Sequence, residues 1–337
     1  MTSKALIRAE ALDGWAEILE DRGLNFRLLS RGLNKNIKKN EMGHDAIILS
    51  EFVEFLERAS SESHTPGLAW SAGHTANYAT RGVLGRAVLS SKTVGGAFRT
   101  LTNYFPLLQE ATDLKLSVSE DWATLSYRIL DPDIWPRHSD AMYSLGIYSN
   151  LFKQAAPDAW SQSEITVEAT PEHVDGNIPS VIQANCVFDG ETNSLRFPSR
   201  ALDCKLAVIP SFTNSKKLLD KELVKLIRSA PIVQRVRCAI FKELSEGSVG
   251  QEHISKTLGM TSRTMRRRLA KENLSFQAIL DDCRMRTAAL EFRMQKNDSL
   301  SEMALRLGYS EHSTFSRAFT RWAGMPPQDY RKLLQLN

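Results

Sequence analysis

Three arginines near residue 265 have the spacing of one helix face. Arg263, Arg266 and Arg267 stand at positions i, i+3 and i+4. A helix would place their guanidinium groups together, away from the apolar Met265 and Leu269. A guanidinium is a planar donor fork that binds the O6 and N7 atoms of guanine in bidentate fashion or clamps a phosphate. A run of arginines alone is more often a solvated surface. The surrounding elements must therefore show whether these arginines form a binding face.

A later segment has the pattern of two helices joined by a sharp turn. Ser299 and Glu302 have the spacing of a capping box, and an apolar stripe follows them. Gly308 then ends this helix, because glycine adopts a positive φ at little steric cost. The next helix is predicted from about residue 311 to 323, with Ser310 as its N-cap. This layout is a helix-turn-helix.

The second helix of this pair is predicted to have two unlike sides. Phe315, Phe319 and Trp322 recur at spacings of four and three and would pack inward. The opposite side carries hydroxyl and basic side chains: Ser313, Thr314, Arg317 and Arg321. One side is therefore expected to pack, and the other to face DNA.

The segment around the three arginines repeats this layout. Residues 254–260 match residues 303–309 at an offset of 49, which places Gly259 on Gly308. Past the turn the offset becomes 50, so the turns differ by one residue. The chain therefore contains two helix-turn-helix copies, with turns at Gly259 and Gly308.

The stretch from residue 275 to 294 joins the two copies without proline or glycine. Its apolar residues recur mostly at helical spacing: Phe276, Ile279, Leu280, Cys283, Leu290 and Met294. One helix is therefore predicted, which at 1.5 Å per residue would span roughly 30 Å. Successive major-groove faces are separated by roughly 34–36 Å, so one chain could read two adjacent grooves.

The stretch from about Ser248 to Leu334 resembles the DNA-binding domain of the AraC/XylS transcription regulators. Its strongest part runs from Gly308 to Arg331 and is similar to the family signature almost position by position. The resemblance implies an all-α domain with two helix-turn-helix units joined by a linker helix. It also implies promoter DNA and RNA polymerase as partners, and activation rather than repression.

Carried over by position, the resemblance implies roles for single side chains. DNA base contacts would fall on Arg263, Thr264, Arg266, Arg267, His312, Ser313, Thr314 and Arg317. Phosphate contacts would fall on Lys271 and Arg321. Many family members place an aromatic or long polar residue where this chain has Arg263, so the resemblance does not fix base preference. His312 could contact either a base or a backbone phosphate.

Charge is divided unevenly along the chain. Residues 216–334 hold 23 Lys and Arg against 13 Asp and Glu, a net charge of +10, and the rest carries −6. A basic surface gains affinity for phosphates through counterion release, and an acidic one is repelled. We therefore expect an effector-binding or dimerisation domain at 1–210, a linker at 211–230 and a DNA-binding domain at 231–337.

Other classes of site lack their sequence signals. The four cysteines form no C-x-x-C pair and are interpreted as buried, reduced thiols: Cys186, Cys204, Cys238 and Cys283. No zinc-ligand spacing occurs, so neither a metal nor a cofactor is expected. The N-terminus lacks a signal-peptide core and no run of 18 apolar residues occurs, so a cytoplasmic protein without membrane contact is expected.

Residues 1–210 are predicted to form an α+β domain. Helices are expected near residues 14–20, 50–59, 93–101 and 140–154. Alternating apolar residues predict a hairpin of strands 113–119 and 123–130. Further strands are expected at 165–169, 186–188 and 194–197.

The stretch from Arg81 to Pro106 resembles the sensor region of one AraC-type subgroup. That subgroup includes regulators of ornithine and arginine use and mycobacterial virulence regulators, and the similarity covers roughly residues 15–205. The first hundred residues are predicted to be mainly helical, unlike the all-β barrel of the arabinose regulator, so an arabinose ligand is not to be assumed. Five aromatic residues could line a pocket or form plain core: Trp70, Tyr104, Tyr143, Tyr148 and Trp160. The ligand-binding residues stay unknown.

The sequence thus favours a DNA-binding transcription regulator that forms a homodimer and responds to a small metabolite. One alternative gives the N-terminal domain only an oligomerising role. Another is a DNA-repair alkyltransferase, because such enzymes can carry an AraC-type unit. The cysteines here lack the Pro-Cys-His-Arg context that such an enzyme typically uses, so no enzyme activity is expected.

Overall fold

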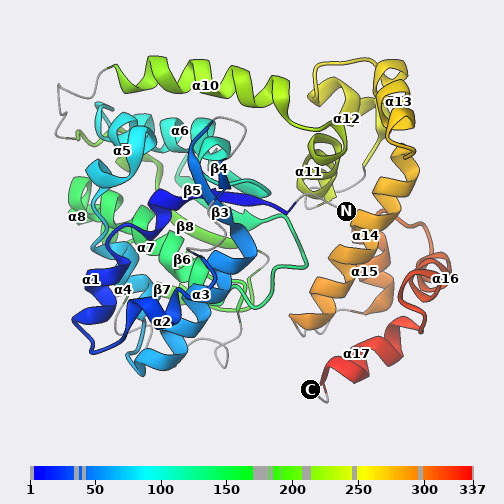
Figure 1. The fold of residues 1–337 in the computed structure, drawn as a ribbon, viewed down its shortest axis with the longest axis horizontal. Coiled ribbons are helices and arrows are strands. Elements are labelled where there is room, and N and C mark those ends of the chain that lie inside the picture. The colour runs from blue at the N-terminus through cyan, green and yellow to red at the C-terminus, as the bar shows by residue number, and fades with distance from the viewer. Residues whose placement is uncertain are drawn as a thin grey trace. The chain divides into compact units, whose positions relative to one another are not determined.

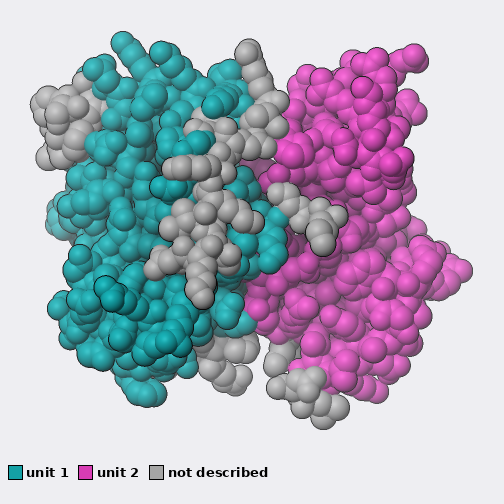
Figure 2. All heavy atoms as spheres, in the orientation of Figure 1, with its two compact units in different colours: residues 1–129, 136–229 teal, residues 130–135, 230–337 magenta. Residues whose placement is uncertain are grey.

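The structure is a computed structural model that describes residues 4–33, 38–39, 43–169, 182, 185–190, 192–206, 214–244, 249–294 and 299–335. The chain forms two compact units (Figure 2). Unit 1 comprises residues 1–129 and 136–229, and unit 2 comprises residues 130–135 and 230–337. Unit 1 has an α+β fold and unit 2 is helical, as predicted.

A five-stranded sheet lies at the centre of unit 1 (Figure 1). Its strands, in spatial order, are β4 (Thr112–Val118), β5 (Trp122–Ile129), β8 (Asn193–Pro198), β6 (Glu164–Thr166) and β7 (Asn185–Val187). Neighbouring strands are antiparallel except for β6 and β7. The predicted hairpin is confirmed, since β4 and β5 pair with Leu116 opposite Leu125. Strand β5 buries every second residue, as a half-buried strand should.

Helices surround this sheet and provide much of the core of unit 1. They are α1 (Trp15–Glu20), α2 (Phe26–Leu29), α3 (Leu49–Ser63), α4 (Leu68–His74), α5 (Gly82–Leu89), α6 (Val94–Tyr104), α7 (His138–Ala155), α8 (Pro157–Trp160) and α10 (Ser215–Ser229). The described residues of unit 1 also form the short 3-10 helices η1 (Ala9–Leu12), η2 (Tyr78–Thr80), η3 (Phe105–Leu107) and η4 (Ser199–Asp203). The predicted helices correspond to α1, α3, α6 and α7, and α4 and α5 were not predicted.

Helix α7 is buried along most of its length because it packs against both α4 and the sheet. Two glycines allow α4 and α7 to approach closely. A Cβ atom at Gly73 would lie 2.1 Å from the carbonyl oxygen of Tyr143, and one at Gly146 would lie 2.4 Å from that of Trp70. No larger residue fits at either position without moving a backbone.

A second, small sheet lies in the first fifty residues and was not predicted. Its strands β1 (Leu6–Arg8), β3 (Asp45–Ile48) and β2 (Lys38–Lys39) lie in the order β1-β3-β2 and pair antiparallel. They contain three, four and two residues, too few for an alternating pattern to stand out in the sequence.

Helix α10 overlaps the predicted linker and packs within unit 1. Leu219 is completely buried, and Glu222 accepts a hydrogen bond of 2.7 Å from the buried guanidinium of Arg8. Asp220 accepts a hydrogen bond from the hydroxyl of Tyr104. Burial and this carboxylate together raise the pKa of Tyr104 to about 12. These contacts hold α10 against the residues around α5 and η3.

Unit 2 contains seven helices in its described residues. They are α11 (Ile232–Leu244), α12 (Gln251–Thr257), α13 (Ser262–Lys271), α14 (Phe276–Arg293), α15 (Leu300–Arg306), α16 (His312–Ala323) and α17 (Pro327–Gln335). They form two separate apolar clusters, one around α11 to α13 and the other around α15 to α17. Helix α14 contributes to both, with Cys283 in the first cluster and Met285 in the second.

A buried carboxyl group lies beneath the hairpin of unit 1. Asp140 Oδ2 accepts a hydrogen bond of 2.6 Å from the Tyr127 hydroxyl, which in turn accepts one of 2.9 Å from Gln109. Burial raises the pKa of Asp140 to about 7, with the nearby Glu57 adding to the rise. The Tyr127 hydrogen bond and the charge of Arg137 act in the opposite direction.

We expect Asp140→Asn to weaken the pH dependence of folding stability. The folded chain binds the Asp140 proton more tightly than the unfolded chain, whose pKa lies near 3.8. The resulting stabilisation is complete in acid and is lost as the pH rises from about 4 through about 7. Asparagine cannot ionise, so urea unfolding at about pH 5 and pH 8 should show a smaller loss in the variant. Replacing the exposed Asp158 by asparagine is the control, and parallel curves for wild type and Asp140→Asn would contradict the expectation.

Candidate functional site

Helix α13 presents the arginines that were predicted to contact DNA. Its N-cap is Thr261, whose hydroxyl accepts a hydrogen bond of 3.2 Å from the backbone N–H of Thr264. Met265 and Leu269 are completely buried in the first cluster of unit 2. The basic side chains of the helix are all exposed: Arg263, Arg266, Arg267, Arg268 and Lys271. The helix therefore has the predicted division into a packed and a free face.

Helix α16 has the same division. Phe315 and Phe319 are completely buried and occupy the positions that Met265 and Leu269 have in α13. The predicted DNA-contacting residues of this helix are exposed: His312, Ser313, Thr314, Arg317 and Arg321. The prediction that Trp322 packs inward was wrong in part, since 43% of it is exposed. Its ring still contacts the edge of the packed face, 5.8 Å from the ring of Phe319.

The start of α16 differs from the prediction by one residue. The N-cap is Glu311 in an extended conformation, and the helix begins at His312, so Ser310 lies outside it. In the first copy the N-cap Thr261 follows Gly259 by two residues, whereas Glu311 follows Gly308 by three. The extra residue in the second turn therefore accounts for both the shift of the N-cap and the change of offset from 49 to 50.

Both helix-turn-helix turns depend on glycines with positive φ. Gly259 has φ of 67° and Gly308 has φ of 78°, as the sequence predicted. The capping box before the second turn is also present, with Ser299 and Glu302 bonding each other's backbone N–H groups. In the first copy, the hydroxyls of Ser255 and Ser262 lie 3.0 Å apart and connect α12 to α13.

The second turn has a support that sequence reasoning missed. Arg284, on α14, donates a hydrogen bond of 3.2 Å to the carbonyl oxygen of Gly308. Its guanidinium also lies 4.8 Å from the ring centroid of Tyr309. A cation–π contact of this kind adds to the hydrogen bond, so α14 fixes the turn directly. The sequence offered no signal for Arg284 beyond its place in a long polar-faced helix.

The basic residues of the two exposed faces have no internal counter-charge. Within the described residues, no carboxylate lies within 4.0 Å of Arg263, Arg266 or Arg267, nor of Lys271, Arg317 or Arg321. Several basic residues elsewhere in unit 2 are paired with carboxylates, for example Arg237 with Asp282 at 3.2 Å and Arg306 with Glu291 at 2.7 Å. Unpaired guanidiniums on an exposed face need not break an ion pair to bind phosphates or base edges.

Helix α14 holds the two copies on one continuous element. It begins after Ser275, which accepts a hydrogen bond of 3.1 Å from the N–H of Ala278, and it continues to Arg293. The apolar residues that predicted it are buried, together with Met294 beyond its end. At 1.5 Å per residue its 18 residues extend about 27 Å, slightly less than the predicted segment.

The cysteines are less buried than predicted. Only Cys283 is buried, and Cys186, Cys204 and Cys238 are partly exposed. Cys283 lies on the inner side of α14, whereas Cys186 is on β7 at the edge of the sheet.

Among the described residues, no group of three or more His, Cys, Asp or Glu side chains could hold a metal ion. None of the described helices is both long and apolar enough to cross a membrane.

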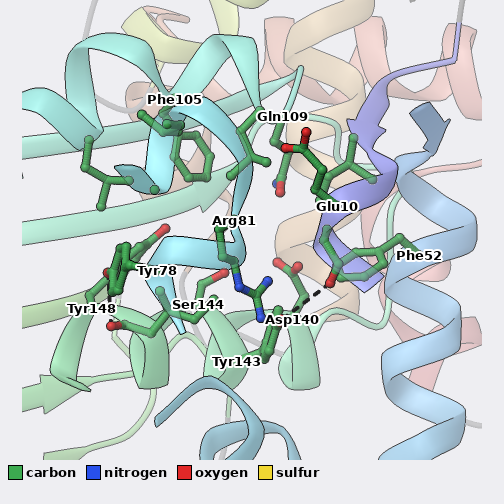
Figure 3. Close-up of a pocket in the computed structure, with 17 residues that line it drawn as sticks. Glu10, Phe52, Tyr78, Arg81, Phe105, Gln109, Asp140, Tyr143, Ser144 and Tyr148 are labelled. Carbon is green, nitrogen blue, oxygen red and sulfur yellow. Dashed lines mark hydrogen bonds between the residues drawn. The ribbon is translucent and has the colours of Figure 1, made fainter. Parts of the chain in front are cut away.

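Unit 1 contains a pocket that sequence reasoning did not assign (Figure 3). It lies between η1, η2, α3, α5, α6, η3 and α7, and it opens to the surface. Tyr143 and Tyr148, both named as pocket candidates from the sequence, line it. The other candidates, Trp70, Tyr104 and Trp160, are buried outside its walls. Segments from residue 7 to residue 148 contribute, so no local sequence pattern could reveal it.

Two glycine variants should separate the effect of positive φ from the effect of Arg284. Gly259→Ala places a side chain at positive φ with open space around it, which should cost about 1–2 kcal/mol. Gly308→Ala has the same strain, and its Cβ would also lie 2.8 Å from Arg284 Nη2. We expect Gly308→Ala to increase amide hydrogen exchange in α15 and α16 more than Gly259→Ala does in α12 and α13. Equal increases would show that Arg284 does not hold the turn.

Two family models match different parts of the chain. A family model described as the arabinose-binding domain of AraC transcription regulator, N-term, matches residues 37–206, and a helix-turn-helix domain model matches residues 254–333. The chain is 25% identical over 288 residues to an ornithine utilization regulator of Pseudomonas aeruginosa, covering 84% of this chain and 83% of that protein.

Two further proteins are similar over most of their length. The regulator VirS of Mycobacterium tuberculosis is 25% identical over 346 residues, covering 97% of this chain and 96% of that protein. Among solved structures, the transcriptional regulator CdpR of Pseudomonas aeruginosa is 21% identical and covers 82% of this chain and 90% of that chain, with a TM-score of 0.38.

The first family model spans just over half of the chain, and the second covers α13 and α16, the helices with the exposed basic faces, which are called the recognition helices below. The chain therefore belongs to the AraC family of transcription regulators, with an N-terminal ligand-binding domain and a DNA-binding helix-turn-helix region.

Proposed function

We propose that this regulator activates transcription by binding promoter DNA through α13 and α16 under the control of a small metabolite bound in unit 1. One observation carries the DNA-binding part. Two helices on one linker helix each pair a buried apolar face with an exposed face of basic side chains that lack counter-charges. Such a face attracts the duplex and can hydrogen-bond base edges in the major groove.

The individual roles follow from position on the two recognition helices. Base contacts are assigned to the residues that begin each exposed face: Arg263, Thr264, Arg266, Arg267, His312, Ser313, Thr314 and Arg317. Phosphate contacts are assigned to Lys271 and Arg321, which lie towards the C-terminal ends of α13 and α16. Their exposure supports these roles for all except Thr264, which is half-buried and contacts the N-cap Thr261.

The regulatory part of the proposal rests on unit 1. Its pocket supports metabolite control over a purely oligomerising role, because an oligomerisation module needs no internal hollow. We further propose, from the family, a cytoplasmic homodimer that contacts RNA polymerase. The proposed domain limits are 1–210 for the sensor, 211–230 for the linker and 231–337 for the DNA-binding domain.

The cysteines do not favour the alkyltransferase alternative. An acceptor cysteine must be activated as a thiolate, which requires a lowered pKa. Burial instead raises the pKa of Cys186 to about 11 and raises that of Cys283 further. Neither thiol has the environment of a nucleophile.

Alanine at Arg267 or Arg317 should weaken specific DNA binding. Loss of a bidentate base contact costs about 1–3 kcal/mol and should relax the preference at one base position. The measurement is fluorescence anisotropy on a duplex selected by the wild-type protein from a random pool, followed by selection with each variant. Lys332→Ala, on the exposed surface of α17, removes the same charge outside the recognition helices and is the control. Unchanged affinity and unchanged preference in both arginine variants would refute the proposal.

Alanine at Lys271 or Arg321 should have a different effect. A lost phosphate contact weakens binding to all sequences alike and lowers the salt dependence, so the slope of log affinity against log salt should fall by about 1. A salt titration on selected and random duplexes separates this from base recognition. The assignment to phosphates fails if either variant discriminates between duplexes differently from wild type.

A further inference from the structure

The pocket of unit 1 has mostly apolar walls. Phe52 from α3, Leu84 from α5, Leu101 from α6, Phe105 from η3 and Ile147 from α7 line it, with the rings of three tyrosines (Figure 3). Apolar walls offer few hydrogen bonds to water molecules. Transfer of an apolar molecule from water to such walls lowers the free energy. The occupant therefore needs an apolar body.

Most polar groups around the pocket already have partners within unit 1. The Tyr78 hydroxyl donates to the carbonyl oxygen of Ile147 at 3.1 Å, and the Tyr143 hydroxyl donates to that of Ala11 at 3.4 Å. Gln109 donates to Thr112 and to Tyr127, and Asp140 accepts from Tyr127. These groups are therefore not available as the main anchor of a ligand.

Arg81 is different. Its guanidinium lies 5.4 Å from the ring centroid of Tyr143, and its Nε atom is buried without a hydrogen-bond partner among the described residues. Among those residues, no carboxylate comes within 4.0 Å of it, although its charge lowers the pKa of Asp13 against the stronger effect of burial. A half-buried cation without an anion is costly, and an incoming anion would remove that cost.

Glu10, a second acidic residue of the pocket beside Asp140, lies against the first turn of α5. A Cβ atom at Gly82 would lie 2.1 Å from Glu10 Oε2, so the carboxylate touches the start of the helix. The helix dipole favours a negative charge there. The dipole of α5 thus stabilises the charge of the Glu10 carboxylate. This carboxylate would repel a second anionic group on a ligand bound at Arg81.

We propose that the pocket binds an organic acid with an apolar body and a single carboxylate, and that Arg81 binds this carboxylate. The apolar walls hold the body, the ring of Tyr143 keeps the guanidinium in place, and Glu10 disfavours dicarboxylates. The inference rests on the proposed function in taking this pocket as the effector site, and it adds the chemical class of the effector and its anchoring residue.

The test uses the full chain and isothermal titration calorimetry. The probes are octanoate and 3-phenylpropanoate, their uncharged amides, and phenylalanine as a zwitterion of similar size. Wild type should bind the acids at least about tenfold more tightly than the amides, since a charge-assisted pair is lost with the amide. Arg81→Met should remove this preference, and Arg81→Lys should retain part of it. Arg86→Met, on α5 itself and outside the pocket, should behave as wild type.

Several results would overturn the inference. These are equal binding of acid and amide by wild type, tighter binding of phenylalanine, no binding by any acid, or an unchanged preference in Arg81→Met. Circular dichroism of each variant checks folding, and the wild-type comparison of acid with amide decides without any variant. Duplex binding is measured on the same preparations. Lost acid binding with intact duplex binding refutes the pocket assignment alone, and the reverse refutes the DNA-binding proposal alone.

Discussion

The packing of α14 into two apolar clusters is the constraint on which the DNA-binding unit depends. Cys283 and Met285 are two residues apart on roughly opposite faces of this helix, and one is buried in each cluster. Each cluster also buries the inner face of one recognition helix, through Leu269 in α13 and Phe319 in α16. Burial of these faces leaves the arginines outside, where they have no carboxylate partner among the described residues. The exposure of the basic residues is thus a consequence of how the buried apolar residues are divided between the two clusters.

Unit 2 could be predicted well from the sequence because its signals are local. A capping box, a glycine with positive φ and apolar residues three and four apart each act within one or two helical turns. The sequence predictions for unit 2 were wrong or incomplete where contacts between separate helices determine the structure. Ser310 was taken as an N-cap because serine is a favoured N-cap residue, although the change of offset already indicated one extra residue in the second turn. Trp322 is more exposed than its spacing predicted. Arg284 acts on Gly308 across 24 positions, which no local pattern reveals.

Unit 1 was harder to predict, for reasons that its structure makes plain. The central hairpin has clear alternation and was found, but the strands of the small sheet are too short to show a period. Helix α5 was missed because Gly82 and Gly85 weaken the helical pattern, and both glycines are needed for close contacts, with Glu10 and with the backbone of Tyr78. The pocket depends on such contacts between distant segments. Tyr143 and Tyr148 could be named as candidates, whereas Arg81 could not be distinguished from any other arginine.

The uninterrupted course of α14 has a consequence for the promoters that this regulator can use. In an α-helix each residue adds about 100° of rotation, so the length of α14 fixes the azimuth of one helix-turn-helix about the axis relative to the other. One inserted residue would swing the second copy by about 100°, and seven, close to two full turns, would nearly restore its azimuth while moving it about 10 Å along the axis. Under the proposed contact of both copies with one duplex, the operator tolerates changes of base more easily than changes in the number of base pairs between its two contact blocks.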